Sequence, residues 1–155
     1  MTTAPATLTG SEANARAWAE EIAASHEAWL YCRDQGDGRC LSTEAKAVLR
    51  FHRYDGTNHD EIADEIEETC RESALSIDVR TGWGHPSCDL VPEEFQILLS
   101  TGGPALRITG DLADFEPDRP RIEHQDWGTP WTEWRRDVDA KALAWFAGLF
   151  WFGEG

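Results

Sequence analysis

Apolar residues recur at helical spacing through the first part of the chain. From Ala15 to Trp29 they return every three or four positions. Thr9, with Glu12 three residues later, forms a capping-box pattern that is typical of a helix start. We therefore predict a first helix from Thr9 to about Cys32.

Two more helices are predicted before residue 74. Ser42 can cap a second helix that runs to about His52, because its hydroxyl can accept a hydrogen bond from a backbone N–H of the first turn. Asn58 with Glu61 repeats the capping pattern and predicts a third helix as far as Glu72.

The spacing changes from helical to alternating after residue 74. Apolar and polar residues alternate from Leu75 to Arg80, which predicts a strand. Further strands are predicted at residues 95–99, 106–108 and 121–127. A glycine-rich turn separates the second strand from the third.

The remaining segments are expected to connect these strands or to cover them. The segment Gly110 to Pro120 is polar and predicts a turn region, and Gly128 to Pro130 should end the fourth strand. Asp137 or Asp139 can cap a last helix. This helix is apolar on most sides from Ala142 onward, so we expect it to be buried.

The order of these elements predicts an α+β fold. N-terminal helices come first, a four-stranded antiparallel meander follows, and a C-terminal helix packs on the sheet. The chain of 155 residues is expected to form a flexible leader at 1–8 and one domain at 9–155. Its helical part would cover 9–73, and the sheet with the last helix 74–155. The apolar run at 142–152 is too short to span a bilayer.

Charge adds an expectation about partners. The chain has 29 acidic residues against 14 Lys and Arg, a formal net charge of -15 at pH 7. This argues against direct contact with nucleic acid or a membrane, whose anionic surfaces need basic residues, and favours a basic protein surface as partner. The N-terminus shows no signal-peptide pattern, so we expect a cytoplasmic protein with four thiols, mostly buried.

The densest charge of one sign lies in the third predicted helix. At about 100° per residue, its acids fall in one sector, while Ile62, Ile66 and Cys70 fall on the opposite side. Only Arg71 within the helix answers them. Such a row can occupy a basic groove built for a nucleic-acid backbone, and an ordinary solvated helix face is the alternative. The predicted partner contacts are Asp60, Glu61, Asp64, Glu65, Glu67 and Glu68.

Two further segments stand out, Ile97 to Ile108 and Gln125 to Trp134. The second contains three tryptophans beside acidic residues. Such a group either closes a small core or forms a recognition surface for a Lys or Arg side chain. Trp83 lies in a long connection, and long connections are often functional. Trp83 and Trp131 are therefore further candidate contacts.

A resemblance to a known group of proteins rests on four runs: LSIDVRTGW, ILLSTGGPALRI, QDWGTPWTEW and LFWFGEG. Together they resemble small acidic proteins carried on bacterial phages, plasmids and integrative elements, a group without an established activity. The resemblance covers about residues 70–155. It implies a mobile-element accessory protein, a context in which inhibitors of host defence, including anti-CRISPR and anti-restriction proteins, are frequent.

Catalytic and structural roles are the alternatives to this binding role. The His and Asp residues between His52 and Asp60 could hold a divalent metal, although their spacing fits no defined zinc or calcium loop. Cys88 and His124 could act together if the fold brings them close. No nucleotide-binding or serine-hydrolase motif is present.

The sequence therefore favours a non-enzymatic acidic protein-binding module without a cofactor. The more specific expectation is an anti-CRISPR-like inhibitor of nucleic-acid-binding defence machinery that acts as a DNA mimic. A small metal-dependent or Cys/His hydrolase is one alternative. A structural homo-oligomer subunit with a tryptophan-rich seam is another.

Overall fold

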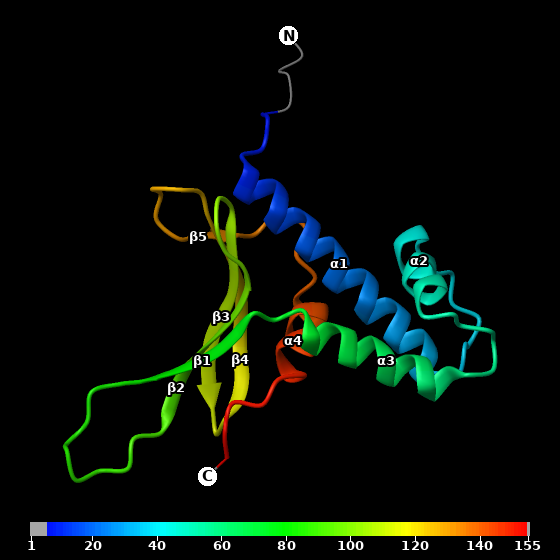
Figure 1. Cartoon of the computed structure of the whole chain (residues 1–155). Coiled ribbons are helices and arrows are strands. Elements are labelled where there is room, and N and C mark those ends of the chain that lie inside the picture. Colours follow the sequence, from blue (N-terminus) through cyan, green and yellow to red (C-terminus); the bar gives the residue numbers. More distant parts are fainter. Residues whose placement is uncertain (1–5, 155) are drawn as a thin grey trace.

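One antiparallel sheet organises the protein, and the computed structural model describes it within residues 6–154 (Figure 1). Five strands follow one another as a meander, in the order β1-β2-β3-β4-β5. The sequence predicts four of them. The strands are β1 (Ser76–Thr81), β2 (Pro92–Ser100), β3 (Ala105–Ala113), β4 (Glu116–Gln125) and β5 (Thr132–Trp134).

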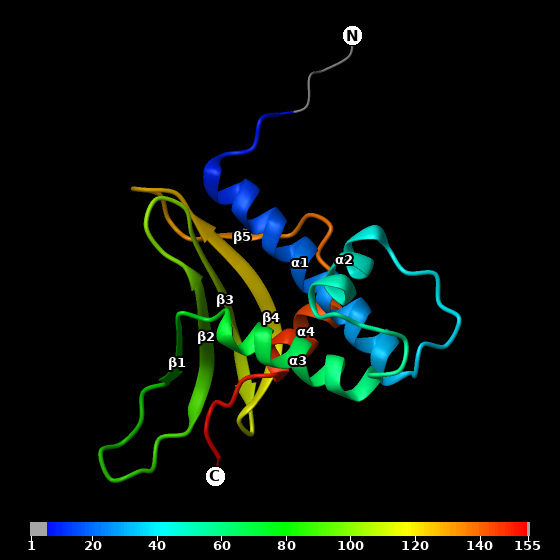
Figure 2. The ribbon, with the colours of Figure 1, turned by 45° about the vertical axis from the view of Figure 1, so that its right-hand side comes forward.

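The helices lie on one side of this sheet, as the two views show (Figures 1 and 2). The helices are α1 (Gly10–Arg33), α2 (Thr43–Phe51), α3 (His59–Glu72) and α4 (Ala140–Gly148). α1 contacts β3, β4 and β5, α4 contacts β4, and both α2 and α3 pack on α1. The α+β fold with a C-terminal helix on the sheet is confirmed. Within residues 6–154, no helix combines the length and the apolar character needed to cross a membrane.

The core lies between the helices and the inner sheet face. Burial of each large aliphatic or aromatic side chain contributes about 1.5–3 kcal/mol. The predicted apolar sides of α3 and α4 are both buried, as expected. The largest fully buried apolar side chains are Phe146, Ile62, Ile66, Ile97, Leu106, Ile108 and Ile122.

A tight hairpin replaces the polar turn region predicted at 110–120. β3 continues to Ala113, and the chain reverses through Asp114 and Phe115, whose φ angles are 50° and 67°. The prediction was wrong because neither residue is a glycine, which is the usual signal for such backbone angles. Gly110 is required inside β3, because a Cβ there would lie 2.6 Å from the Phe95 ring.

β5 has only three residues, too few to show an alternating pattern, so the four-strand prediction misses it. The break predicted at 128–130 is correct and separates β4 from β5. The predicted leader falls largely on residues 1–5, which lie outside the described part of the chain. Leu8 packs against the core.

The helix caps follow the sequence with one exception. The Thr9 and Ser42 side chains accept hydrogen bonds from the first turns of α1 and α2, and Asp139 caps α4. The Asn58 side chain makes no cap hydrogen bond to α3. Its amide oxygen instead accepts a hydrogen bond from the backbone N–H of Asp55, at 3.0 Å. The Asn58 side chain therefore stabilises the preceding turn and does not cap α3.

Candidate functional site

The inner acidic row of α3, formed by Asp60, Asp64 and Glu67, is paired with α1. Arg33 reaches all three residues, with N–O distances of 3.8, 2.8 and 3.2 Å respectively. Hydrogen bonding to Asp64 is the main cause of the raised pKa of Arg33. Arg71 is the one basic residue within α3, as the sequence shows, but it is not the only basic residue that pairs with the acids of α3. Arg33 of α1 pairs with three of them.

Glu67 has a structural role between α1 and α3. Its side chain is only 18% exposed. Its carboxylate accepts hydrogen bonds from Trp29 Nε1 at 2.8 Å, Arg33 Nη2 at 3.2 Å and Arg71 Nη2 at 2.8 Å. With three internal donors, this carboxylate has little capacity left for a partner.

The outer acidic row of α3 faces solvent. It consists of four exposed glutamates: Glu61, Glu65, Glu68 and Glu72. Their spacing places them on one line that extends about 16 Å along the helix axis. In the described part of the chain, this row has one ion pair with an arginine, Arg71 with Glu68 at 3.1 Å, and one contact with a histidine, His52 Nδ1 with Glu65 at 3.3 Å. The outer row therefore keeps surplus negative charge that α1 does not reach.

A shallow hollow of about 420 Å³ borders the outer row between α2 and α3. Phe51 lines this hollow with 76% of its surface exposed, together with Glu65, Glu68 and one basic residue, Arg53. An exposed ring next to carboxylates suits a Lys or Arg side chain, whose stem is apolar and whose head is cationic. The acidic row and the aromatic ring thus form one surface.

The two candidate tryptophans lie at opposite ends of the sheet. Trp83 is fully exposed in the connection 82–91 between β1 and β2, which projects beyond the sheet (Figure 1). Trp131 is half-buried beside the β2–β3 turn, where the Arg107 guanidinium lies 4.2 Å from its ring centroid. They do not form a shared surface, and neither belongs to the outer acidic row.

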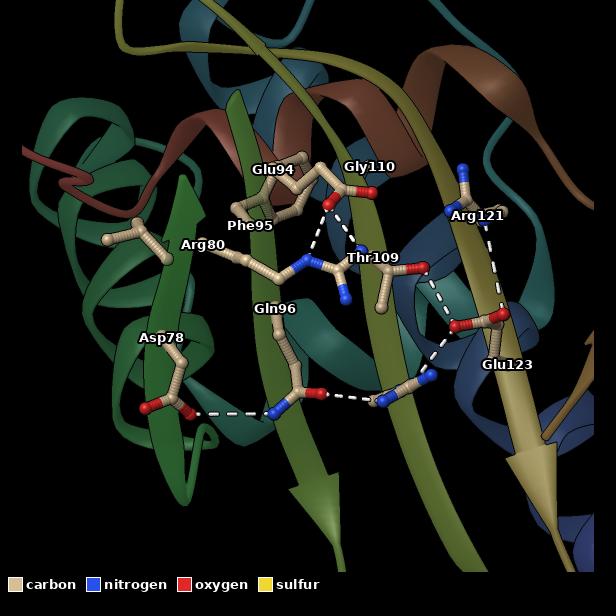
Figure 3. Close-up of a pocket in the computed structure, with 11 residues that line it drawn as sticks. Asp78, Arg80, Glu94, Phe95, Gln96, Thr109, Gly110, Arg121 and Glu123 are labelled. Atoms are coloured by element: carbon tan, nitrogen blue, oxygen red, sulfur yellow. Dashed lines mark hydrogen bonds and ion pairs between the residues drawn. The ribbon is translucent and has the colours of Figure 1, made fainter. Parts of the chain in front are cut away.

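The sheet face opposite the helices carries a network of paired charges (Figure 3). It surrounds a cavity of about 220 Å³ that is lined by three arginines and three acids. Arg107 Nε donates to Glu123 at 3.0 Å and its Nη1 donates to Gln96 at 2.8 Å, while Arg80 pairs with Glu94. Alternation predicts a polar face but not these cross-strand partners. Because these three arginines and three acids balance, the lining of the cavity offers no surplus charge to a partner.

The histidines near the α2–α3 turn have separate partners. His52 contacts Glu65, and His59 Nδ1 lies 3.2 Å from the Tyr54 hydroxyl. The Asp55 carboxylate accepts hydrogen bonds within the turn, and these lower the pKa of Asp55. The hydrogen bond from the Thr57 hydroxyl is the largest cause. Across residues 6–154, no group of three or more His, Cys, Asp or Glu side chains is placed to hold a metal.

Cys88 and His124 are not brought together by the fold. Cys88 is exposed in the connection after β1, whereas His124 is buried in β4 beside Leu106, near the other end of the sheet. The expectation of mostly buried thiols holds for half of them. Cys32 and Cys70 are buried, while Cys40 and Cys88 are exposed.

A partly buried Ser–His–Asp cluster joins the start of α1 to the end of β4 and the residue after it. Ser11 Oγ lies 2.9 Å from His124 Nδ1 and donates to Asp126 Oδ2 at 2.7 Å, while the Ser11 backbone N–H donates to Asp126 Oδ1. The single hydroxyl proton goes to the carboxylate, so the imidazole donates to the serine and cannot act as its base. The Ser11 hydroxyl is the main cause of the lowered pKa of Asp126. This fully buried serine fixes the start of α1.

Comparisons with models of protein families, with curated proteins and with solved structures found no match to this chain. The candidate site therefore rests on the geometry of α3 and its neighbours.

Proposed function

We propose that the protein is a binding module that attaches to a basic protein surface through the outer acidic row of α3. The observation that carries this proposal is the line of four exposed glutamates that Arg33 does not reach. Like charges one helical turn apart cost about 0.2–0.5 kcal/mol per pair, so the row is locally unfavourable. A cationic partner would relieve that repulsion.

The linear arrangement of the row supports mimicry of a nucleic-acid backbone. Its four carboxylates follow one another about every 5.4 Å along about 16 Å of helix axis, a wider spacing than the phosphates of one DNA strand, at about 3.4 Å along the axis. Asp60 and Asp64 remain exposed on the flank and widen the acidic strip, even though Arg33 pairs with them. Binding of this kind depends on ion contacts and weakens as salt rises.

Competition for a nucleic-acid site is the mechanism that fits this surface. The protein would occupy a Lys/Arg groove, with Phe51 covering the aliphatic stem of one basic side chain. The resemblance to mobile-element proteins supports host defence machinery as the source of that groove. No cofactor takes part in this mechanism.

Affinity capture from bacterial lysate with matched charge variants tests the proposal. The double variant Glu65→Lys/Glu68→Lys alters the outer row, and Glu116→Lys/Glu154→Lys makes the same charge change at exposed positions of the sheet side and C-terminus. We expect the wild type and the sheet-side variant to capture the same basic protein at low salt and to release it at high salt. The outer-row variant should lose it.

Equal capture by the two double variants would contradict the proposal. If both lose the partner to the same extent, net charge alone explains the binding, and if both keep it, the outer row is not the binding site. Circular dichroism must show that α3 is intact in both variants.

The variant Phe51→Ser tests the contribution of the aromatic ring in the same capture experiment. Its exposed ring can be removed without opening the core, and we expect weaker capture at unchanged net charge.

A further inference from the structure

β1 is an edge strand with an uncovered apolar row. Ile77 and Val79 lie on the helix side of the sheet, since they pair with Ile97 and Phe95, which are both buried. Yet Ile77 is 42% exposed, Val79 is 45% exposed, and Leu75 just before the strand is 61% exposed. This apolar row points to the helix side of the sheet, but α1 and α4 lie over β3 to β5 and leave it open.

The free side of β1 is not blocked against pairing. An edge strand presents unpaired backbone N–H and C=O groups, and proteins usually protect such edges with charged side chains, proline, a β-bulge or a covering segment. The six residues of β1, SIDVRT, include neither lysine nor proline. Its two charged residues, Asp78 and Arg80, contact Gln96 and Glu94 of β2, and the register shift between β1 and β2 lies at the end of the strand, between Arg80 and Thr81. An apolar row beside a free backbone edge is a template for a further strand.

We propose that β1 of a second copy of this chain pairs antiparallel with β1 and joins the two sheets. The two-fold axis would stand perpendicular to the sheet, which keeps the apolar row and the polar row of both copies on matching faces. Under this symmetry, two registers pair five residues of the strand. One is centred on Asp78 and the other on Val79.

Charge selects between these registers. The register centred on Asp78 places two carboxylates directly opposite each other, which is destabilising. The register centred on Val79 places Asp78 of each copy opposite Arg80 of the other. Within one copy, Arg80 already pairs with Glu94 of β2, and Gln96 of β2 contacts Asp78 at 3.4 Å. The dimer would therefore extend an alternating row of cross-strand partners.

The apolar side favours the same register. Val79 would meet its own copy at the axis, and Ile77 would face Thr81 of the second copy. Trp83, fully exposed two residues beyond the strand, would lie near Leu75 of the second copy. The self-complementary pattern identifies a second copy as the occupant. A ladder of five residue pairs is small, so we expect dimerisation to depend on concentration.

Sedimentation equilibrium of the full chain tests this proposal independently of α3 and its partner. Asp78→Arg and Arg80→Asp each place like charges across the axis. We expect the average mass of the wild type to rise from 17.4 kDa toward twice that value with concentration, whereas each single variant stays near 17.4 kDa. An equimolar mixture of the two variants restores both ion pairs and should regain the dimer.

Trp127→Ala is the control, because this exposed residue lies beyond β4, away from β1. It should dimerise like the wild type, and melting curves should show that all variants are folded. A wild-type mass of 17.4 kDa up to about 1 mM would overturn the proposal. Dimers that survive both β1 variants, or folded variants whose mixture fails to dimerise, would also overturn it.

Discussion

At the residue scale, Glu67 shows how one carboxylate of an acidic helix can serve the fold. Its neighbours Asp64 and Glu68 are 71% and 62% exposed, while Glu67 is 18% exposed and accepts three hydrogen bonds. Helical periodicity places all three residues in one sector. It does not show that α1 covers one edge of that sector with Trp29 and Arg33.

Glu67→Ala should destabilise the protein by about 1.5–3 kcal/mol, since Trp29 Nε1 and two guanidinium groups lose an acceptor. Glu67→Gln keeps an oxygen acceptor and should cost less. The matched control is Glu68→Ala, an exposed position of the same helix that should stay within about 0.5 kcal/mol of the wild type. Urea denaturation at neutral pH measures these differences. Equal losses for Glu67→Ala and Glu68→Ala would rule out the structural role of Glu67.

At the scale of elements, local patterns account for most of the architecture. Capping residues and helical spacing predict all four helices, and the apolar pattern predicts part of each strand from β1 to β4, with the first half of β4 missed. The β3–β4 hairpin was missed because Asp114 and Phe115 take positive φ without glycine. The exposed side of the candidate site was predictable from charge. The split into inner and outer rows was not, because it depends on Arg33 of α1.

Gly110 is the glycine whose role depends on packing between strands. An added Cβ would lie 2.6 Å from the Phe95 ring and 2.8 Å from the Asp118 carbonyl oxygen. Gly110→Ala should therefore destabilise the protein by about 1–3 kcal/mol. Gly103→Ala in the β2–β3 turn is the control, because a Cβ there meets no atom within 4 Å and its φ is not positive. Thermal or urea unfolding of the two variants compares them, and similar midpoints would contradict this account.

At the scale of the whole molecule, surplus charge and paired charge are separated. The open sheet face balances three arginines against three acids around its cavity. Arg33 pairs with the inner row of α3, and the outer row is left with its surplus. Of these two surfaces, the outer row of α3 therefore carries surplus negative charge and the lining of the sheet cavity does not. We expect a basic partner to be drawn to α3, and association to slow as salt rises.

Displacement of nucleic acid from the captured basic protein tests the central claim most directly. A fluorescently labelled nucleic acid bound to that protein is titrated with wild type or with Glu65→Lys/Glu68→Lys, and its anisotropy is followed. The account predicts that the wild type returns the anisotropy to the free value, and that the outer-row variant needs a concentration at least about tenfold higher. Anisotropy that stays high or rises at saturating wild type would show both ligands bound together and would contradict mimicry.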